Sequence, residues 1–242
     1  MPNKLKDLLS KKLTEKQLAL LPSSYDVVGS ILIFSDFPEQ LSKKEKIIGN
    51  EILKNYRQIK SVLKKSRKYS GKYRTPKLKL LAGENSREAE YKENNIRLKL
   101  DVEKVYFSPR LSEERKRIFQ QIKNNESVLV MFSGVAIYPI VIAKNTKAKN
   151  ITAIELNPIA HKYALENLKL NKIKNIYLIK GDVKKVLPKI NKEFDRIIMP
   201  LPKGAEHFLK LALSKIKKKG IMHFYSFAEE NKYDNIIAII NN

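Results

Sequence analysis

Short apolar runs alternate with amphipathic segments through the second half of the chain, from about residue 109. Apolar positions at helical spacing predict helices over residues 112–123, through PIVIAKN, from PIAHKYALENLKLN and from about GAEHFLKLALSKI. The apolar runs between them have strand length: SVLVMFSG, NITAIEL, NIYLIKGD, FDRIIMPLP and GIMHFYSF. Strands that alternate with helices along a chain indicate a parallel sheet with helices on both faces.

The first half has a different pattern, in which basic helices precede alternating strands. Residues 4–20 and 42–66 have apolar positions at helical spacing, and the second predicted helix is rich in lysine. Residues 26–34, DVVGSILIF, predict a strand that bends at its glycine. An expected loop, RKYSGKYRTP, precedes the alternating stretches PKLKLLAG and AEYKENNIRLKLDVEKVYF. This order predicts a small α+β domain over residues 1–108 and an α/β domain over residues 109–242.

The net charge of the chain indicates what kind of partner it binds. Its 242 residues include 49 Lys and Arg against 25 Asp and Glu, which gives a net charge of +24. Such an excess favours a polyanionic partner, nucleic acid first, because like charges repel one another in the folded state. The alternative is a composition bias, since Lys, Ile and Asn are all abundant.

Other residue types exclude several classes of site. The chain has no cysteine, so it has no disulfide, thiolate metal site or cysteine nucleophile. The histidines at positions 161, 207 and 223 are scattered without metal-ligand spacing, so we expect no zinc site. Neither a run of about 18 apolar residues nor an apolar signal-peptide core occurs, and a cytoplasmic protein is therefore expected.

Polar or conformationally special residues follow four successive predicted strands. Gly134 follows the first, Glu155 ends the second, Asp182 follows the third, and Pro200 and Pro202 follow the fourth. In parallel sheets ligands bind beyond the carboxyl ends of the strands. Each residue has an ordinary structural reading as a turn, cap or helix stop, but together they favour a nucleoside cofactor.

The cofactor classes differ in their loop requirements. A nicotinamide site wants three glycines after the first strand, and FSGVAIYP supplies one. A nucleoside triphosphate site wants a glycine-rich loop that ends in Lys-Ser/Thr, which is absent from the sequence. The class I S-adenosylmethionine (AdoMet) arrangement tolerates both absences.

The stretch VYFSPRLSEER, residues 105–115, places charged residues directly after a Ser-Pro turn. In a helix that begins after Pro109, Arg110 and Glu114 lie on one face. An intrahelical ion pair on a surface helix is the simple interpretation. The alternative is a charged site in which the carboxylate and the guanidinium act on a ligand.

Several segments, taken in order, resemble the archaeal and eukaryotic tRNA (guanine-37-N1)-methyltransferases. They are YFSPRLSEER, MFSGVAIYPIVIAK, AIELNPIAHKYALENLKLNK, GDV, DRIIMPLPKGAEHFLKLAL and GIMHFYSF, within roughly residues 25–230. The resemblance implies an α/β fold, with a Rossmann-like class I methyltransferase domain and a parallel sheet, preceded by a small basic α+β domain. It also implies transfer of methyl from AdoMet to N1 of the guanosine just 3′ of the anticodon.

The resemblance assigns roles to individual residues. Guanine N1 carries a proton at neutral pH, and Glu114 matches the base that removes it. Arg74 matches an arginine that stabilises negative charge at O6, so the small domain would contribute part of the active site. Arg110 and Pro202 match substrate-binding positions. The cofactor-binding positions are Tyr106, Arg115, Phe132, Ser133, Gly134, Glu155, Leu156, Asp182, Val183 and Pro200.

The same resemblance implies a partner and a way to reach the base. The partner is tRNA, with guanosine 37 leaving its stack, and basic residues of 42–68 and 64–79 are expected to bind anticodon-stem phosphates. No membrane partner is expected, and a monomer is favoured.

The sequence also departs from the family pattern. Val130 stands in place of an acid after the first strand, Ala136 in place of a second glycine, and Pro200-Leu201-Pro202 in place of Asn-Leu-Pro. We expect the extra N-terminal domain of the family to be missing or reduced to a helix. After GIMHFYSF the family fold has a further helix and a final antiparallel strand, but the sequence stops at YDNIIAIINN. We therefore expect either that the sheet has one strand fewer or that the remaining segment is supplied elsewhere. Two alternatives stay open: a wybutosine-pathway transferase that modifies nucleotide 37 by aminocarboxypropyl or methyl transfer, and a catalytically silent tRNA-binding protein.

Overall fold

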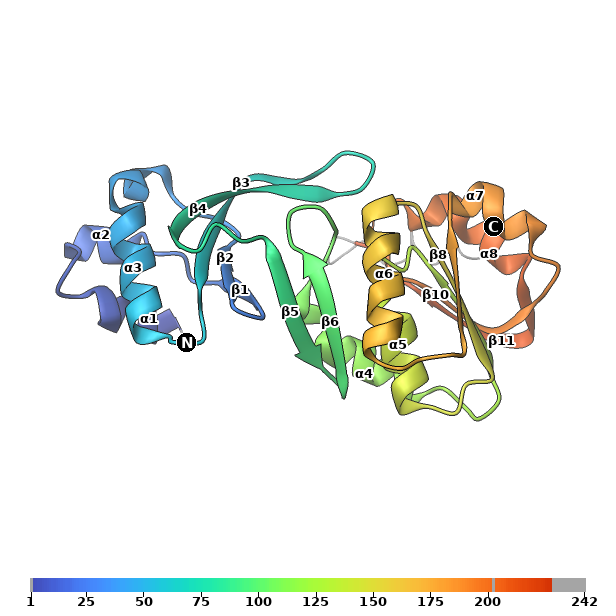
Figure 1. The fold of residues 1–242 in the computed structure, drawn as a ribbon. Helices are drawn as coiled ribbons and strands as arrows, with labels where there is room; N and C mark the ends of the chain where they lie inside the picture. Colours follow the sequence, from blue (N-terminus) through green and yellow to red (C-terminus); the bar gives the residue numbers. More distant parts are fainter. Residues whose placement is uncertain (1, 202, 228–242) are drawn as a thin grey trace. The chain divides into compact units, whose positions relative to one another are not determined.

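A computed structural model describes residues 2–201 and 203–227, without the side chains of residues 2–4 and 68 (Figure 1). The chain forms two compact units. The first comprises residues 1–93 and 97–112, and the second comprises residues 94–96 and 113–242. Arg110, which the predicted boundary after residue 108 assigns to the second domain, lies in the first unit. In the described ranges no helix is long and apolar enough to cross a bilayer.

The first unit contains a four-stranded sheet with helices packed against it. The sheet order is β1-β2-β3-β4, with β2 and β3 parallel and the other pairs antiparallel. Buried apolar residues of the helices, among them Leu9, Leu41, Ile48 and Ile52, pack against Leu32 and Phe34 of β2. The elements are α1 (Pro2–Leu9), α2 (Glu15–Ala19), β1 (Tyr25–Val28), β2 (Ile31–Phe34), α3 (Glu45–Asn55), β3 (Ser61–Ser70), β4 (Thr75–Gly83) and the hairpin strands β5 (Glu88–Glu93) and β6 (Ile96–Asp101).

The second unit is a parallel five-stranded sheet in the order β11-β10-β7-β8-β9. Helices α5 and α6 cover one face, and α7 and α8 cover the other (Figure 1). The fold class predicted from the alternation of strands and helices is confirmed. The elements are α4 (Ser112–Gln120), β7 (Ser127–Met131), α5 (Ile137–Asn145), β8 (Asn150–Glu155), α6 (Pro158–Leu170), β9 (Ile176–Lys180), α7 (Val183–Val186), β10 (Phe194–Met199), α8 (Leu209–Leu213) and β11 (Ile216–Phe224).

The predicted strand over residues 26–34 was wrong, because the segment is an antiparallel hairpin of β1 and β2. Gly29 has a φ of 58°, and a Cβ there would lie 2.1 Å from the carbonyl oxygen of Glu90. Only glycine fits a left-handed turn that approaches another backbone so closely. The glycine therefore reverses the chain where a bend in a single strand was expected.

The predicted helix over residues 42–66 was also too long. A 3₁₀ helix, Glu39–Lys44, leads into α3, and residues 61–70 form β3. Strand β3 pairs with β2 on one side and β4 on the other, so backbone pairing overrides its helical spacing. The expected loop over residues 67–76 was too long, because only residues 71–74 form the turn of the β3–β4 hairpin and the rest belong to the two strands. The predicted helix over residues 4–20 is divided into α1 and α2. The expectation that the sheet lacks its last strand concerns residues after GIMHFYSF, which lie outside the described residues from residue 228 on.

Candidate active site

The predicted cofactor-binding residues of the second unit, apart from Arg115 on α4, follow four neighbouring strands. The loops after β7, β8, β9 and β10 lie together at the carboxyl edge of the sheet, because parallel strands all end at the same edge. The backbone N–H of Gly134 donates to Glu155 Oε2 at 2.6 Å. The N–H of Gly181 donates to the backbone carbonyl of Glu155 at 2.8 Å. Glu155 therefore joins the ends of three strands.

The loop after β7 has an unusual backbone. Phe132, Gly134 and Ala136 all lie in the left-handed region, with φ values of 56°, 58° and 64°. This conformation costs a non-glycine residue about 1 kcal/mol or more, and such residues cluster at ligand sites. The conformation also explains why glycine suits the position of Ala136, which is fully buried at the start of α5.

Ser133, in the same loop, offers a polar group to a ligand. Its side chain is 3% exposed, and its Oγ has no hydrogen-bond partner among the residues the structure describes. A buried hydroxyl of this kind is rarely left unpaired in a protein. The loop therefore fits a polar ligand that enters from the carboxyl edge.

The Glu155 carboxylate is held by backbone donors. Oε1 accepts from the N–H of Asn157 at 2.6 Å, and Oε2 accepts from Gly134. Burial raises the pKa of Glu155, and the N–H groups of Asn157, Gly134 and Leu156 oppose that rise. Each carboxylate oxygen has two lone pairs, so both can also accept from ligand hydroxyls.

The remaining predicted positions at this edge have simpler surroundings. Asp182 caps α7, since its Oδ1 accepts from the N–H of Lys184 at 2.9 Å, and the neighbouring Val183 is buried. Leu156 and Pro200 are half-buried after β8 and β10. Pro202 lies outside the described residues. Among those residues no group of three or more His, Asp and Glu side chains could hold a metal ion.

Glu114, the predicted base, lies in the first turn of α4. Its two carboxylate oxygens accept from Nε and Nη2 of Arg117, both at 2.7 Å. The hydroxyl of Tyr225 donates to Oε1 at 2.6 Å. The Arg117 guanidinium lowers the pKa of Glu114, with smaller contributions from Tyr225 and His223, while burial opposes the shift. Glu114 is thus ionised at neutral pH and can accept a proton.

The simple interpretation of VYFSPRLSEER, an ion pair between Arg110 and Glu114, was wrong. Arg110 lies in a 3₁₀ helix, η2 (Pro109–Leu111), and its Nε donates to Asp26 Oδ1 at 2.6 Å. Glu114 takes Arg117 as its partner because residues three apart also share a helix face. Arg117 and Tyr225 were not predicted as partners of Glu114. The spacing of Glu114 and Arg117 was a usable signal, whereas the contact with Tyr225 spans 111 residues.

A buried polar cluster lies beside this helix. Arg196 of β10 is fully buried, and its Nε donates to Glu126 Oε2 at 2.7 Å. Its Nη1 lies 2.7 Å from His223 Nε2, so that nitrogen accepts and the histidine is neutral. Burial lowers the pKa of His223 to about 4, with further lowering by Arg196 and Arg117. Arg115 is also buried, with its guanidinium 5.9 Å from the ring centre of Tyr138.

The first unit carries the other predicted site residues. Arg74 lies in the turn of the β3–β4 hairpin with a φ of 49°, and its N–H donates to the carbonyl of Gly71 at 3.1 Å. Tyr106 packs on Tyr69, with ring centres 5.0 Å apart. Lys65 lies 4.5 Å from the centre of the Tyr69 ring. The first unit therefore presents basic and aromatic groups close together.

Comparison with known families agrees with this arrangement. Residues 89–241 match the TRM5/TYW2 methyltransferase domain, and residues 5–86 match the TYW2 N-terminal domain. The chain belongs to the TRM5/TYW2 family. Among its relatives, the tRNA (guanine(37)-N(1))-methyltransferase Trm5b of Pyrococcus abyssi is 43% identical over 229 residues, with 95% of this chain and 67% of the relative covered. The resemblance stated from the sequence motifs is confirmed.

Another TRM5/TYW2 relative is the tRNA (guanine(37)-N(1))/4-demethylwyosine(37)-methyltransferase Taw22 of Nanoarchaeum equitans. It is 40% identical over 268 residues, with 90% of this chain and 88% of the relative covered.

Solved structures of the family have the same fold. The crystal structure of Pyrococcus abyssi Trm5b matches with a TM-score of 0.85 and 42% identity, over 95% of this chain and 68% of that chain. A complex of aTrm5 and tRNALeu matches with a TM-score of 0.84 and 34% identity, over 97% of this chain and 69% of that chain. Methanocaldococcus jannaschii Trm5 in complex with adenosine matches with a TM-score of 0.81 and 35% identity, over 98% of this chain and 69% of that chain.

Proposed function

We propose that this chain is a tRNA (guanine37-N1)-methyltransferase that uses AdoMet and acts in the cytoplasm. The observation that carries the proposal is the fixed, ionised carboxylate of Glu114 in a TRM5/TYW2 methyltransferase domain. A related Trm5 binds tRNA and another binds adenosine, as their structures record. These relatives support tRNA and a nucleoside cofactor for this chain.

The carboxyl edge of the second unit offers suitable partners for AdoMet. The Glu155 carboxylate would accept from the ribose hydroxyls, and the Ser133 hydroxyl would gain the partner it lacks. AdoMet, when bound, supplies an electrophilic methyl group on sulfur. Asp182, Val183 and the remaining cofactor-binding residues predicted from the resemblance stay part of this proposal.

Glu114 would act as the general base. Its carboxylate takes the proton from guanine N1, the N1 electron pair forms the bond to the methyl carbon, and the methyl–sulfur bond breaks. Oε2 accepts from Arg117 Nε and has a second lone pair available for N1–H. Arg74 would stabilise the negative charge that develops at O6 as the proton leaves. Tyr106, Arg110, Arg115 and Pro202 would line the guanine and cofactor sites.

Methylation of 4-demethylwyosine at position 37 is a second candidate. It is supported by the relative named for both activities, which this chain matches over 88% of its length. The two reactions share the cofactor and the tRNA position, and they differ in the base that receives the methyl group.

One experiment separates these activities. AdoMet labelled on the methyl or on the carboxyl carbon is incubated with tRNA transcripts that carry G37 or A37, and with tRNA that carries 4-demethylwyosine. Methyl label in the G37 transcript alone is the expected result. Methyl label only in the 4-demethylwyosine tRNA would replace the proposal by the second candidate, and carboxyl label would indicate aminocarboxypropyl transfer.

Variants of two adjacent residues test the base. Glu114→Gln should lower the single-turnover rate by about 10²–10⁴-fold, the usual contribution of a general base, while AdoMet still raises the melting temperature. Glu113→Gln is the matched control, because Glu113 is an exposed neighbour on the same helix. Equal rates in the two variants would remove Glu114 as the base.

A further inference from the structure

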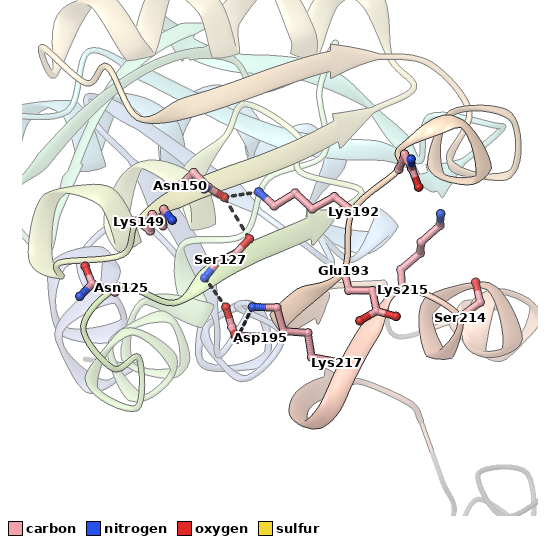
Figure 2. A pocket seen from close by; sticks show the side chains of 11 residues that line it. Asn125, Ser127, Lys149, Asn150, Lys192, Glu193, Asp195, Ser214, Lys215 and Lys217 are labelled. Carbon is pink, nitrogen blue, oxygen red and sulfur yellow. Dashed lines mark hydrogen bonds and ion pairs between the residues drawn. The ribbon is translucent and has the colours of Figure 1, made fainter.

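The amino edge of the parallel sheet, opposite the predicted cofactor site, contains two adjoining polar hollows. The larger, of about 690 Å³, is lined by the segments before β7, β8, β10 and β11. The smaller, of about 280 Å³, shares Asn125, Asp195 and Lys217 with it. Figure 2 shows the side chains of the larger hollow. We call the two together the amino-edge hollow.

Lysine is concentrated in the amino-edge hollow beyond its general abundance. Seven of the 18 lining residues are lysines, whereas Lys and Arg together make up 49 of the 242 residues in the chain. The composition bias that could explain a high overall charge therefore does not explain this cluster. The three acids that line the hollow, Glu126, Glu193 and Asp195, leave an excess of four positive charges.

The floor of the amino-edge hollow is fixed by hydrogen bonds. Ser127 Oγ donates to Asn150 Oδ1 at 3.0 Å, and Lys192 Nζ donates to the same oxygen. The N–H of Ser127 donates to Asp195 Oδ2 at 2.8 Å, and Lys217 pairs with Asp195 Oδ1 at 2.9 Å (Figure 2). The one acid of the floor, Asp195, is thus paired with Lys217, so the excess positive charge comes from the other lysines of the hollow.

Irregular backbone at the start of β11 directs part of this charge outward. The pairing register changes from Phe194 with Ile216 to Arg196 with Ile221, so several residues of β11 stand against one of β10. Lys217, Lys218, Lys219 and Gly220 stand against Asp195 alone, and all three lysines are exposed. A bulge leaves its residues unpaired and re-aims their side chains. The lysine run therefore projects from the edge of the sheet.

The charged surface is wider than one anionic group. It extends from Lys149, before β8, to Lys217 in β11, which are separated by three strand spacings in the order β11-β10-β7-β8. Neighbouring strands lie about 4.8 Å apart, so this distance is about 14 Å. An extended polyanion fits such a surface better than a single phosphate does. Asparagine side chains between the lysines can donate hydrogen bonds to phosphate or ribose oxygens.

We propose that the amino-edge hollow binds the RNA backbone, at phosphates distinct from those of the nucleotide being modified. Strands of five or six residues separate the two edges of the sheet, which amounts to about 16–20 Å. A nucleotide at the carboxyl edge and phosphates at the amino edge are therefore different parts of the RNA. The inference rests on the proposed function because it takes the RNA to be the substrate tRNA.

The test compares two double variants of equal charge. Lys149→Gln/Lys218→Gln removes one exposed lysine from each part of the hollow, and neither side chain has a role in the floor contacts. Lys162→Gln/Lys210→Gln is the control, because these exposed lysines lie on α6 and α8 and line neither part. The affinity of the full chain for an unmodified G37 transcript is measured from 50 to 300 mM KCl, together with the single-turnover methylation rate at saturating tRNA.

Each lost phosphate contact lowers the slope of log affinity against log salt by about 0.7–0.9. The hollow variant should therefore lose about 1.4–1.8 from the slope, the control should match the unaltered chain, and both should methylate at the unaltered rate. Equal slopes in the two variants would overturn the inference. Inorganic phosphate could instead raise the melting temperature of the unaltered chain but not of the hollow variant, while the tRNA slope stays the same in both. That result would show that the hollow binds a small anion and not RNA, and it would also overturn the inference. A slope difference without methyl transfer to any tRNA would leave the RNA surface standing and remove the proposed function.

Discussion

His223 makes the stability of the second unit sensitive to mild acid. It is 9% exposed, accepts from Arg196, and has a pKa of about 4 in the folded chain. In the unfolded chain an ordinary histidine has a pKa of about 6.5. Below pH 6.5 the unfolded state therefore binds a proton that the folded state refuses, and stability falls as the pH falls. The decline ends near pH 4, where the folded state also takes the proton.

The two pKa values set the size of this effect. Between pH 7.5 and 5.0 the histidine alone should cost about 2 kcal/mol of unfolding free energy, out of about 3 kcal/mol over its whole range. His223→Gln removes the titrating group and retains an acceptor for Arg196. The chain with His223→Gln should therefore lose about 2 kcal/mol less than the unaltered chain over the same pH interval.

Urea unfolding followed by circular dichroism at the two pH values measures the difference directly. His207→Gln is the control, since the His207 side chain is 73% exposed. The pKa itself is accessible from the proton resonances of the three histidine rings, assigned with the variants. A His223 resonance that titrates near 6.5, or an equal loss of stability with and without His223, would refute the reasoning.

Three further predictions concern neighbouring groups. Ala136→Gly should raise the unfolding free energy by about 0.5–1 kcal/mol, because glycine adopts a left-handed backbone without strain; an unchanged or lower value in urea unfolding would mean that the loop holds no strain at this residue. Arg117→Gln should raise the pKa of Glu114, so the acid limb of the pH–rate profile should move to higher pH while tRNA affinity stays constant. An unmoved limb would show that the ion pair does not tune the base. Glu126→Ala should destabilise the second unit by about 3–5 kcal/mol, since it leaves the Arg196 charge buried without its carboxylate, and a loss below about 1 kcal/mol in the same unfolding assay would contradict that account.

The parallel sheet was predictable because its central strands, β7, β8 and β10, are buried on both faces. Runs such as SVLVM are almost wholly apolar, and the helices between the strands have their own spacing. The hairpin turn at Gly29 and the strand β3 were not predictable in this way. Their structure depends on the backbone of Glu90 and on pairing with β2 and β4, which local spacing does not contain.

Some features of the candidate site could likewise be predicted from the sequence, and others could not. Glu155, Gly134 and Asp182 could be named from the sequence because they follow recognisable strands, and the sheet then places them at one edge. The residues that surround Glu114 could not be predicted from the sequence, since Tyr225 lies 111 residues away in the chain. The conformation of Ala136 was likewise hidden, because alanine gives no sign that its backbone is left-handed.

The strand order of the second unit has a consequence for how the chain acquires its fold. Val128 of β7 pairs with Arg196 of β10, so the centre of this sheet can form only after a long stretch of chain has been made. The first unit is richer in neighbouring hairpins, β1–β2, β3–β4 and β5–β6, whose contacts close short loops. Local contacts form faster than distant parallel pairs. During synthesis the basic first unit should therefore be folded while β7 and β8 still await their central partner, and the catalytic half of the protein should be the slower to mature.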